Sequence, residues 1–161
     1  MLAEFVELTK FSEFAAIQNS ANFENSVNSE NIYKKGASSM ATFKKFEEIQ
    51  AWKKAREVTK SVYLLTNNSL FSRDFGLRDQ IGRASVSIMA NIAEGHGRRT
   101  RTEFANFLNL SRGSAAEVQS HLYIALDLEY ISTQEFDELY QNLEEISRMN
   151  LSLAKYLRES K

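Results

Sequence analysis

The side chains with the most varied chemistry lie in one short stretch, residues 91–104, with the sequence NIAEGHGRRTRTEF. It combines a carboxamide, a carboxylate, an imidazole, two glycines and three arginines. Such a mixture fits an acid–base catalytic site, a metal site, or a loop that binds phosphate. It equally fits a corner between two helices, where glycine ends one helix and a capping residue begins the next.

The motifs argue against catalysis and against metal binding. The chain has no cysteine, and no Ser, Thr or Lys lies in a recognised nucleophile motif. Glu94 and His96 are only two neighbouring ligands, and His121 has no adjacent carboxylate in the sequence. The glycines at 95 and 97 lack the spacing and the lysine of a phosphate loop. We therefore predict a protein that is not an enzyme and uses no metal or cofactor, and we assign no role to His96.

We interpret residues 91–104 as a structural corner. Gly95 is predicted to lie just past a helix end, where the backbone often turns left-handed. Asn91 and Glu94 are predicted to bond loop amides, or an arginine across the bundle. Thr100 and Glu103 have the spacing of a capping box, so a helix is expected to begin there.

The spacing of apolar residues predicts four helices. Apolar side chains recur every three or four positions over residues 46–67, 77–94, 100–128 and 132–157. The chain has no proline, which is typical of long uninterrupted helices. Because the connections are short, the predicted fold is all-α, an antiparallel up-and-down four-helix bundle.

The ends of these helices carry further signals. Ser72 is a possible cap for the second helix, and Ser132 with Glu135 forms a second capping box. Phe71 and Phe75 are predicted to plug the end of the bundle.

The first 39 residues differ from the rest in composition. Residues 2–17 are predicted to form a short amphipathic helix, and the asparagine- and serine-rich residues after it read as a linker. We expect a weakly structured leader over 1–39, or a mis-assigned start, and a bundle domain over 40–161. No apolar run is long enough to span a membrane, and the lack of cysteine suits a cytoplasmic protein.

Charge is unevenly distributed although the formal net charge is only −1. Residues 73–112 hold seven arginines against four carboxylates, a net charge of +3, whereas residues 127–161 are acidic. Arginine binds phosphate in a bidentate manner. Five arginines are therefore candidates for contact with nucleic acid: Arg83, Arg98, Arg99, Arg101 and Arg112. The alternative is a solvated corner, or salt bridges to the acidic helix of a second subunit.

The second predicted helix has two apolar faces, where a peripheral bundle helix needs one. The second face consists of small and flexible residues, namely Gly82, Val86, Met89 and Ala93. We predict that it contacts another subunit; the alternative is one wide core face with some exposed apolar residues.

Residues 46–63 and 76–132 closely resemble the bacterial four-helix bundle family encoded by intervening sequences in 23S rRNA genes. The resemblance runs from about Phe43 to Leu157. The densest motifs are QIGRA at 80–84, NIAEG at 91–95 and Gly113-Ser114. The chain lacks the prolines often seen before the second helix and before NIAEG. The resemblance implies a homopentameric ring, RNA or protein binding, and no catalytic residues.

Two functional hypotheses follow from the residues and the resemblance together. The first is a non-enzymatic oligomer that binds RNA or a ribonucleoprotein through its arginines. The second is a protein-interaction scaffold, or an accessory subunit of a nucleic-acid enzyme such as a reverse transcriptase, that makes no direct contact with nucleic acid.

Overall fold

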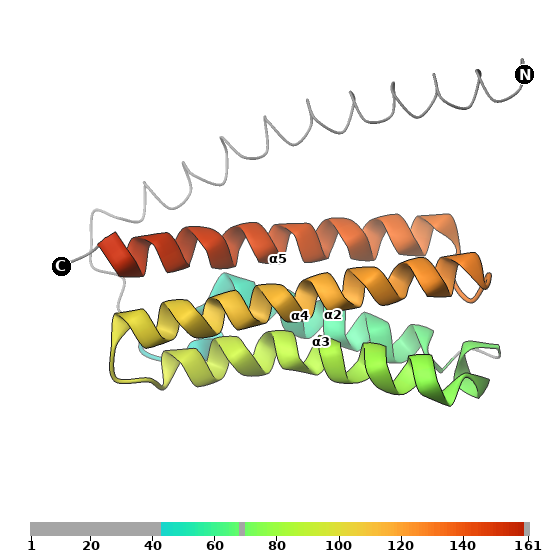
Figure 1. Cartoon of the computed structure of the whole chain (residues 1–161), viewed down its shortest axis with the longest axis horizontal. Helices are drawn as coiled ribbons and strands as arrows, with labels where there is room; N and C mark the ends of the chain where they lie inside the picture. Colours follow the sequence, from blue (N-terminus) through green and yellow to red (C-terminus); the bar gives the residue numbers. More distant parts are fainter. Residues whose placement is uncertain (1–42, 68–69, 160–161) are drawn as a thin grey trace, which may run out of the picture. The chain divides into compact units, whose positions relative to one another are not determined.

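The computed structural model describes residues 43–67 and 70–159, which fold into four α-helices (Figure 1). They are α2 (Gln50–Leu65), α3 (Phe75–His96), α4 (Arg101–Asp127) and α5 (Thr133–Glu159), with the 3₁₀ turns η1 (Phe46–Glu48) and η2 (Phe71–Arg73) before α2 and α3. Successive helices run in opposite directions; each packs on the next, and α5 also packs on α2. The predicted all-α four-helix bundle is confirmed.

The predicted leader, residues 1–39, lies outside the described residues. Among the helices of residues 43–67 and 70–159, none combines the length and the apolar character needed to cross a bilayer.

The ends of the helices differ from prediction mainly around α3. Its N-cap is Asp74, whose carboxylate accepts a hydrogen bond from the Leu77 amide at 3.0 Å. Ser72, the predicted cap, instead lies within η2, and its carbonyl accepts a bond from Arg78. The helix also continues to His96, beyond its predicted end.

Two phenylalanines predicted to plug the bundle end have different environments. Phe71 is fully buried and stacks on Tyr130, with ring centroids 5.2 Å apart. Phe75 is 70% exposed, and the Arg78 guanidinium lies over its ring. The prediction was therefore wrong for Phe75, which is the first residue of α3 and leaves its ring exposed, whereas Leu77 of the same turn packs against the core.

Polar groups from three helices meet inside the core. Ser111 of α4 donates to the carbonyl of Ile88 on α3 at 2.9 Å and accepts from the Asn150 side-chain amide of α5 at 2.9 Å. Ser111 and Asn150 are fully buried. Since a buried polar group is costly without its partner, these bonds fix the axial positions of three helices.

Candidate nucleic-acid interface

Gly95 lies inside α3 and not beyond its end. A Cβ at this position would lie 2.7 Å from Cδ2 of Phe104 and 2.7 Å from Cβ of Phe107, both on α4. Among the described glycines none has a positive φ, so the predicted left-handed residue is absent. Gly95 is required because α4 begins so close to the last turn of α3.

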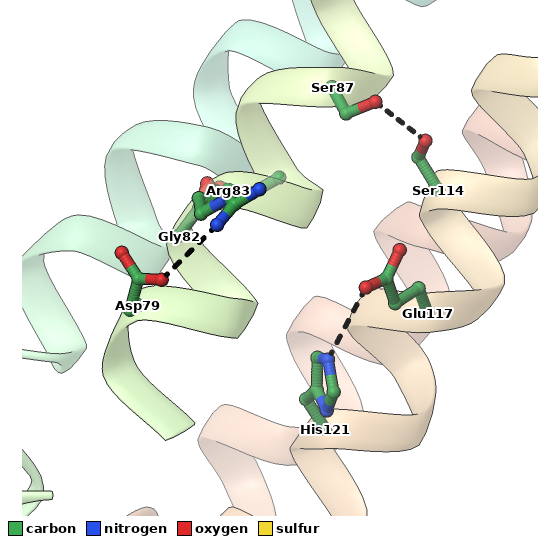
Figure 2. A network of polar contacts seen from close by, with 8 residues as sticks. Asp79, Gly82, Arg83, Ser87, Ser114, Glu117 and His121 are labelled. Atoms are coloured by element: carbon green, nitrogen blue, oxygen red, sulfur yellow. Dashed lines mark hydrogen bonds and ion pairs between the residues drawn. The ribbon is translucent and has the colours of Figure 1, made fainter. Parts of the chain in front are cut away.

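Asn91 and Glu94 make local bonds, contrary to prediction. The Asn91 amide donates to the Ser87 carbonyl at 2.8 Å and lies 3.0 Å from the Ser87 hydroxyl. Glu94 is exposed and pairs with Arg98 one turn later. Besides the Ser111–Ile88 bond, Ser87 and Ser114 link α3 to α4, with their hydroxyl oxygens 2.9 Å apart (Figure 2).

The capping box at the start of α4 forms as predicted. The Thr100 hydroxyl accepts from the Glu103 amide at 3.2 Å, and the Glu103 carboxylate accepts from the Thr100 amide at 3.2 Å.

His96 gains a role that the sequence did not indicate. Its Nε2 lies 2.8 Å from the Phe43 carbonyl, and so fastens the segment before α2 to the end of α3.

The five arginines predicted to bind nucleic acid do not share one face. Arg83 lies 15 residues before Arg98, which places it about 22 Å away along the helix direction. Arg83 pairs with Asp79 at 3.7 Å, as Figure 2 shows. The Arg98 guanidinium, besides pairing with Glu94, lies 4.6 Å from the ring centre of Phe107. Arg83 therefore does not belong with the corner arginines.

Arg112 lies toward the same end of the bundle as a second group of cations, on α5. Gln119 of α4 donates to Glu144 of α5 at 3.1 Å. Arg112 lies two turns before Gln119, and Arg148 lies one turn after Glu144. Because α4 and α5 are antiparallel, both arginines are displaced from this bond toward the same end of the bundle.

A second hydrogen bond between α4 and α5 lies closer to the end of the bundle where α4 begins and α5 ends. Arg158 of α5 donates to the Asn106 side chain of α4 at 3.3 Å. Lys155 is exposed and lies two turns after Arg148, on the same side of α5. We name the basic face as the five cations on this side of α4 and α5: Arg101, Arg112, Arg148, Lys155 and Arg158.

Few carboxylates oppose the basic face. Glu117 turns toward His121, 3.7 Å away, and Glu145 pairs with Lys54 of α2. Glu144 does lie beside the basic face. Its Oε2 is 3.9 Å from Arg148, and its Oε1 accepts a hydrogen bond from Gln119. Glu159 lies one turn after Lys155, and Glu103 lies near Arg101. The five cations of the basic face therefore outnumber the carboxylates beside them.

The guanidinium groups of Arg112 and Arg148 are held by packing more than by partners. In both residues the Nε atom is buried and has no hydrogen-bond partner within the described part of the chain. A terminal nitrogen of Arg112 donates a long hydrogen bond to the Asn109 side chain at 3.5 Å. Since a guanidinium carries five N–H groups, both retain donors that can meet phosphate oxygens.

The α5 members of the basic face were missed because α5 was interpreted as acidic overall. Five of its six carboxylates lie at or before residue 145, whereas Arg148, Lys155, Arg158 and the sixth carboxylate, Glu159, follow. The seven-residue step from Arg148 to Lys155 was a usable signal, since it places both on one side of a helix.

The predicted subunit-contact stripe is partly covered within the chain. Gly82 is buried beside Tyr63 of α2, and Met89 packs against the core. Ala93 is half-buried, and Val86 is 40% exposed. The contact with another subunit stays a prediction, and Val86 is the side chain that offers it most surface.

His121 has a carboxylate neighbour that the sequence analysis overlooked. Glu117 stands one turn earlier on α4, with Nε2 to Oε1 at 3.7 Å (Figure 2). In the part of the chain that the structure describes, no three side chains of His, Asp or Glu gather as a metal site would require.

Comparison with known proteins identifies the relatives of this bundle. The family model described as 23S rRNA-intervening sequence protein matches residues 47–152. The chain belongs to this family. The resemblance carried by QIGRA and NIAEG is thereby confirmed. Gly95, which the packing of α4 requires, closes the second of these motifs.

The structure is also similar to a crystal structure from Bacteroides thetaiotaomicron, described as a protein with unknown function from the S23 ribosomal protein family. The two chains are 27% identical with a TM-score of 0.60, and the match covers 65% of this chain and 98% of the other. No curated protein matches the chain.

Proposed function

We propose that this family member is a non-enzymatic, homo-oligomeric bundle that binds RNA in the cytoplasm through its basic face. The observation that carries the proposal is the alignment of Arg112 and Arg148 between two bonds that join α4 and α5. Phosphate neutralisation by Lys and Arg supplies most of the affinity of such contacts. The name of the family makes the RNA of the 23S intervening region the first ligand to test.

The corner arginines extend the same surface toward α3. Arg99 is exposed in the turn before α4, and Arg101 is exposed on the first turn of α4. Arg98 is partly occupied by Glu94 and Phe107. We therefore assign the principal phosphate contacts to α4 and α5, and a secondary contribution to the corner.

The oligomer in this proposal is a homopentameric ring, in which the basic face would repeat. Repetition would raise the apparent affinity for a long RNA, because later contacts become intramolecular. Val86 and, on α4, the 56% exposed Leu110 one turn from Ser114 are apolar side chains suited to the subunit contact.

Salt-dependent RNA binding tests the proposal. The variant Arg112→Ala/Arg148→Ala/Arg158→Ala should reduce the slope of log affinity against log salt concentration by roughly two. Each phosphate contact on a single strand contributes about 0.7 to this slope. The matched control is Lys53→Ala/Arg56→Ala/Lys60→Ala, which removes three exposed cations from α2. Fluorescence anisotropy with labelled RNA gives both slopes.

Two outcomes would favour the scaffold hypothesis instead. In one, the wild-type protein fails to bind RNA at low salt although it is oligomeric. In the other, both triple variants lose affinity equally, as expected for unspecific attraction. Light scattering of the wild type tests the ring separately, and a monomer at micromolar concentration would contradict it.

A further inference from the structure

The other half of the α4–α5 pair has the opposite charge. Residues 113–147 contain no lysine or arginine, and they contain eight carboxylates: Glu117, Asp127, Glu129, Glu135, Asp137, Glu138, Glu144 and Glu145. Five of the eight accept a hydrogen bond or form an ion pair: Glu135 with Ser132, Glu117 with His121, Glu145 with Lys54, Glu144 with Gln119 and Arg148, and Glu138 with Gln134. Within the described residues, Asp127, Glu129, Asp137 and Glu138 form no ion pair.

An exposed aromatic cluster lies on this half. Tyr123 of α4 is 51% exposed, and its ring centroid is 4.9 Å from Phe136 and 5.9 Å from Tyr140, both on α5. Phe136 is buried and lies 5.4 Å from Tyr140, so it holds both tyrosines in place. Ile124, beside Tyr123 on α4, is also exposed. A rigid, half-exposed apolar surface of this kind marks an interaction site more often than isolated exposed residues do.

Carboxylates from both helices flank these rings. Asp127 follows Tyr123 by one helical turn, and Asp137 directly follows Phe136. Glu144 follows Tyr140 by one turn. The pKa of the Tyr140 hydroxyl is raised, first by burial, then by the Tyr123 side chain, and least by the Glu144 carboxylate. The aromatic faces therefore lie in a negative field, which repels phosphate and attracts cations.

We propose that the acidic–aromatic surface, formed by Tyr123, Ile124, Asp127, Asp137 and Tyr140, binds a polypeptide segment rich in arginine and lysine. The tyrosine rings would accept the cationic groups and the alkyl stems, and the carboxylates would pair with the charges. Charge complementarity selects this occupant over RNA. The proposal is independent of RNA binding, because it uses the opposite half of α4 and α5.

A labelled oligo-arginine peptide, titrated by anisotropy at physiological salt, tests the surface. The variant Asp127→Asn/Asp137→Asn should weaken binding about tenfold, since an exposed charge contact contributes roughly 0.7 kcal/mol and a tenfold change corresponds to about 1.4 kcal/mol. The variant Tyr123→Ala should weaken it about fivefold through loss of the ring face. The control Glu47→Gln/Glu57→Gln removes the same charge from exposed positions elsewhere and should change affinity little.

Equal losses in the acidic variant and its control would overturn the proposal, because binding would then follow net charge alone. An unchanged affinity in Asp127→Asn/Asp137→Asn and in Tyr123→Ala would also overturn it, provided that circular dichroism shows both folded. A smaller assembly mass in the acidic variant would assign the surface to a second copy of the chain and would equally overturn it. RNA affinity measured on the same variants should be unchanged, which separates this result from a failure of the basic face.

Discussion

The two halves of the α4–α5 pair have the same backbone arrangement and opposite surfaces. Toward the ends with Arg101 and Arg158, the outward side carries five cations spread over both helices. Toward the connection between the two helices, 35 consecutive residues carry eight carboxylates and no lysine or arginine. The formal net charge of −1 conceals this division. One pair of helices can thus present two surfaces that attract different partners.

The two halves also differ in how their side chains are held. Arg112 and Arg148 have buried Nε atoms without partners in the described residues and only long contacts at their terminal nitrogens. Tyr123, in the other half, is held by two ring contacts. The basic half therefore offers the terminal guanidinium nitrogens of half-buried arginines, whereas the acidic half offers a preformed apolar surface.

The largest expected effect comes from reversing charge in the basic half. Arg112→Glu/Arg148→Glu should lower RNA affinity about a hundredfold at physiological salt, because attraction to phosphate becomes repulsion. Asp127→Lys/Asp137→Lys, the converse change in the acidic half, should leave RNA affinity equal or slightly higher. Filter binding of both variants at one salt concentration makes the comparison. Equal losses in the two would show that the halves do not act separately.

A smaller effect is expected from the glycine that sets the position of α4. Gly95→Ala should destabilise the fold by about 2 kcal/mol, because overpacking against Phe104 and Phe107 exceeds the gain in helix propensity. Gly113→Ala is the control, since its Cβ would meet nothing within 4 Å; it should stabilise α4 by about 0.5–1 kcal/mol. Urea unfolding measures both changes, and destabilisation of the same size in both would contradict the packing argument.

A capping box begins each helix of the pair, at Thr100 for α4 and at Ser132 for α5. The first lies in the basic half and the second in the acidic half, which allows a matched comparison. Thr100→Ala and Ser132→Ala should each cost about 1 kcal/mol at neutral pH. Hydrogen bonds from the Ser132 amide and hydroxyl lower the pKa of Glu135. A carboxyl group whose pKa is lower in the folded than in the unfolded protein stabilises the fold at any pH above the unfolded pKa. This stabilisation is lost as the pH falls through the folded pKa. The cost of Ser132→Ala should therefore shrink in acid, as unfolding of both proteins at neutral and acidic pH would show. A cost that grew in acid would contradict the assigned bonds.

The smallest effect is expected at the edge of the basic half. Glu94→Ala frees Arg98 from its exposed ion pair, which should change stability by less than about 0.5 kcal/mol. RNA affinity should rise by about twofold, since one carboxylate near the corner arginines is removed. If affinity falls instead, the ion pair orients Arg98 for RNA and the corner belongs to the principal surface.

Local signals explain what the sequence predicted well. The helices follow from the three- and four-residue spacing of apolar side chains, and the capping boxes at Thr100 and Ser132 depend only on residues three apart. The N-cap of α3, Asp74, was missed by two residues, because Ser72 and Asp74 are both good capping residues.

The candidate site was harder because it depends on contacts between helices. A glycine near a helix end fits both a left-handed terminus and a close approach, and only the position of Phe104 decides for Gly95. Similarly, Arg112 and Arg148 form one surface only at the axial register that α4 and α5 adopt. No pattern within a single helix specifies that register.

The hydrogen bond between Ser111 and Asn150 has a consequence for the alignment of charges. A slip of α5 by one turn would move Arg148 about 5.4 Å relative to Arg112 and disturb the spacing of the cations. Aliphatic side chains tolerate such a slip, since one leucine can replace another in a contact. The Asn150 amide does not, because its buried donor would lose Ser111 at a cost of about 1–3 kcal/mol. A buried amide of the core thus helps to set the spacing of charges on the surface, together with the Gln119–Glu144 and Arg158–Asn106 bonds.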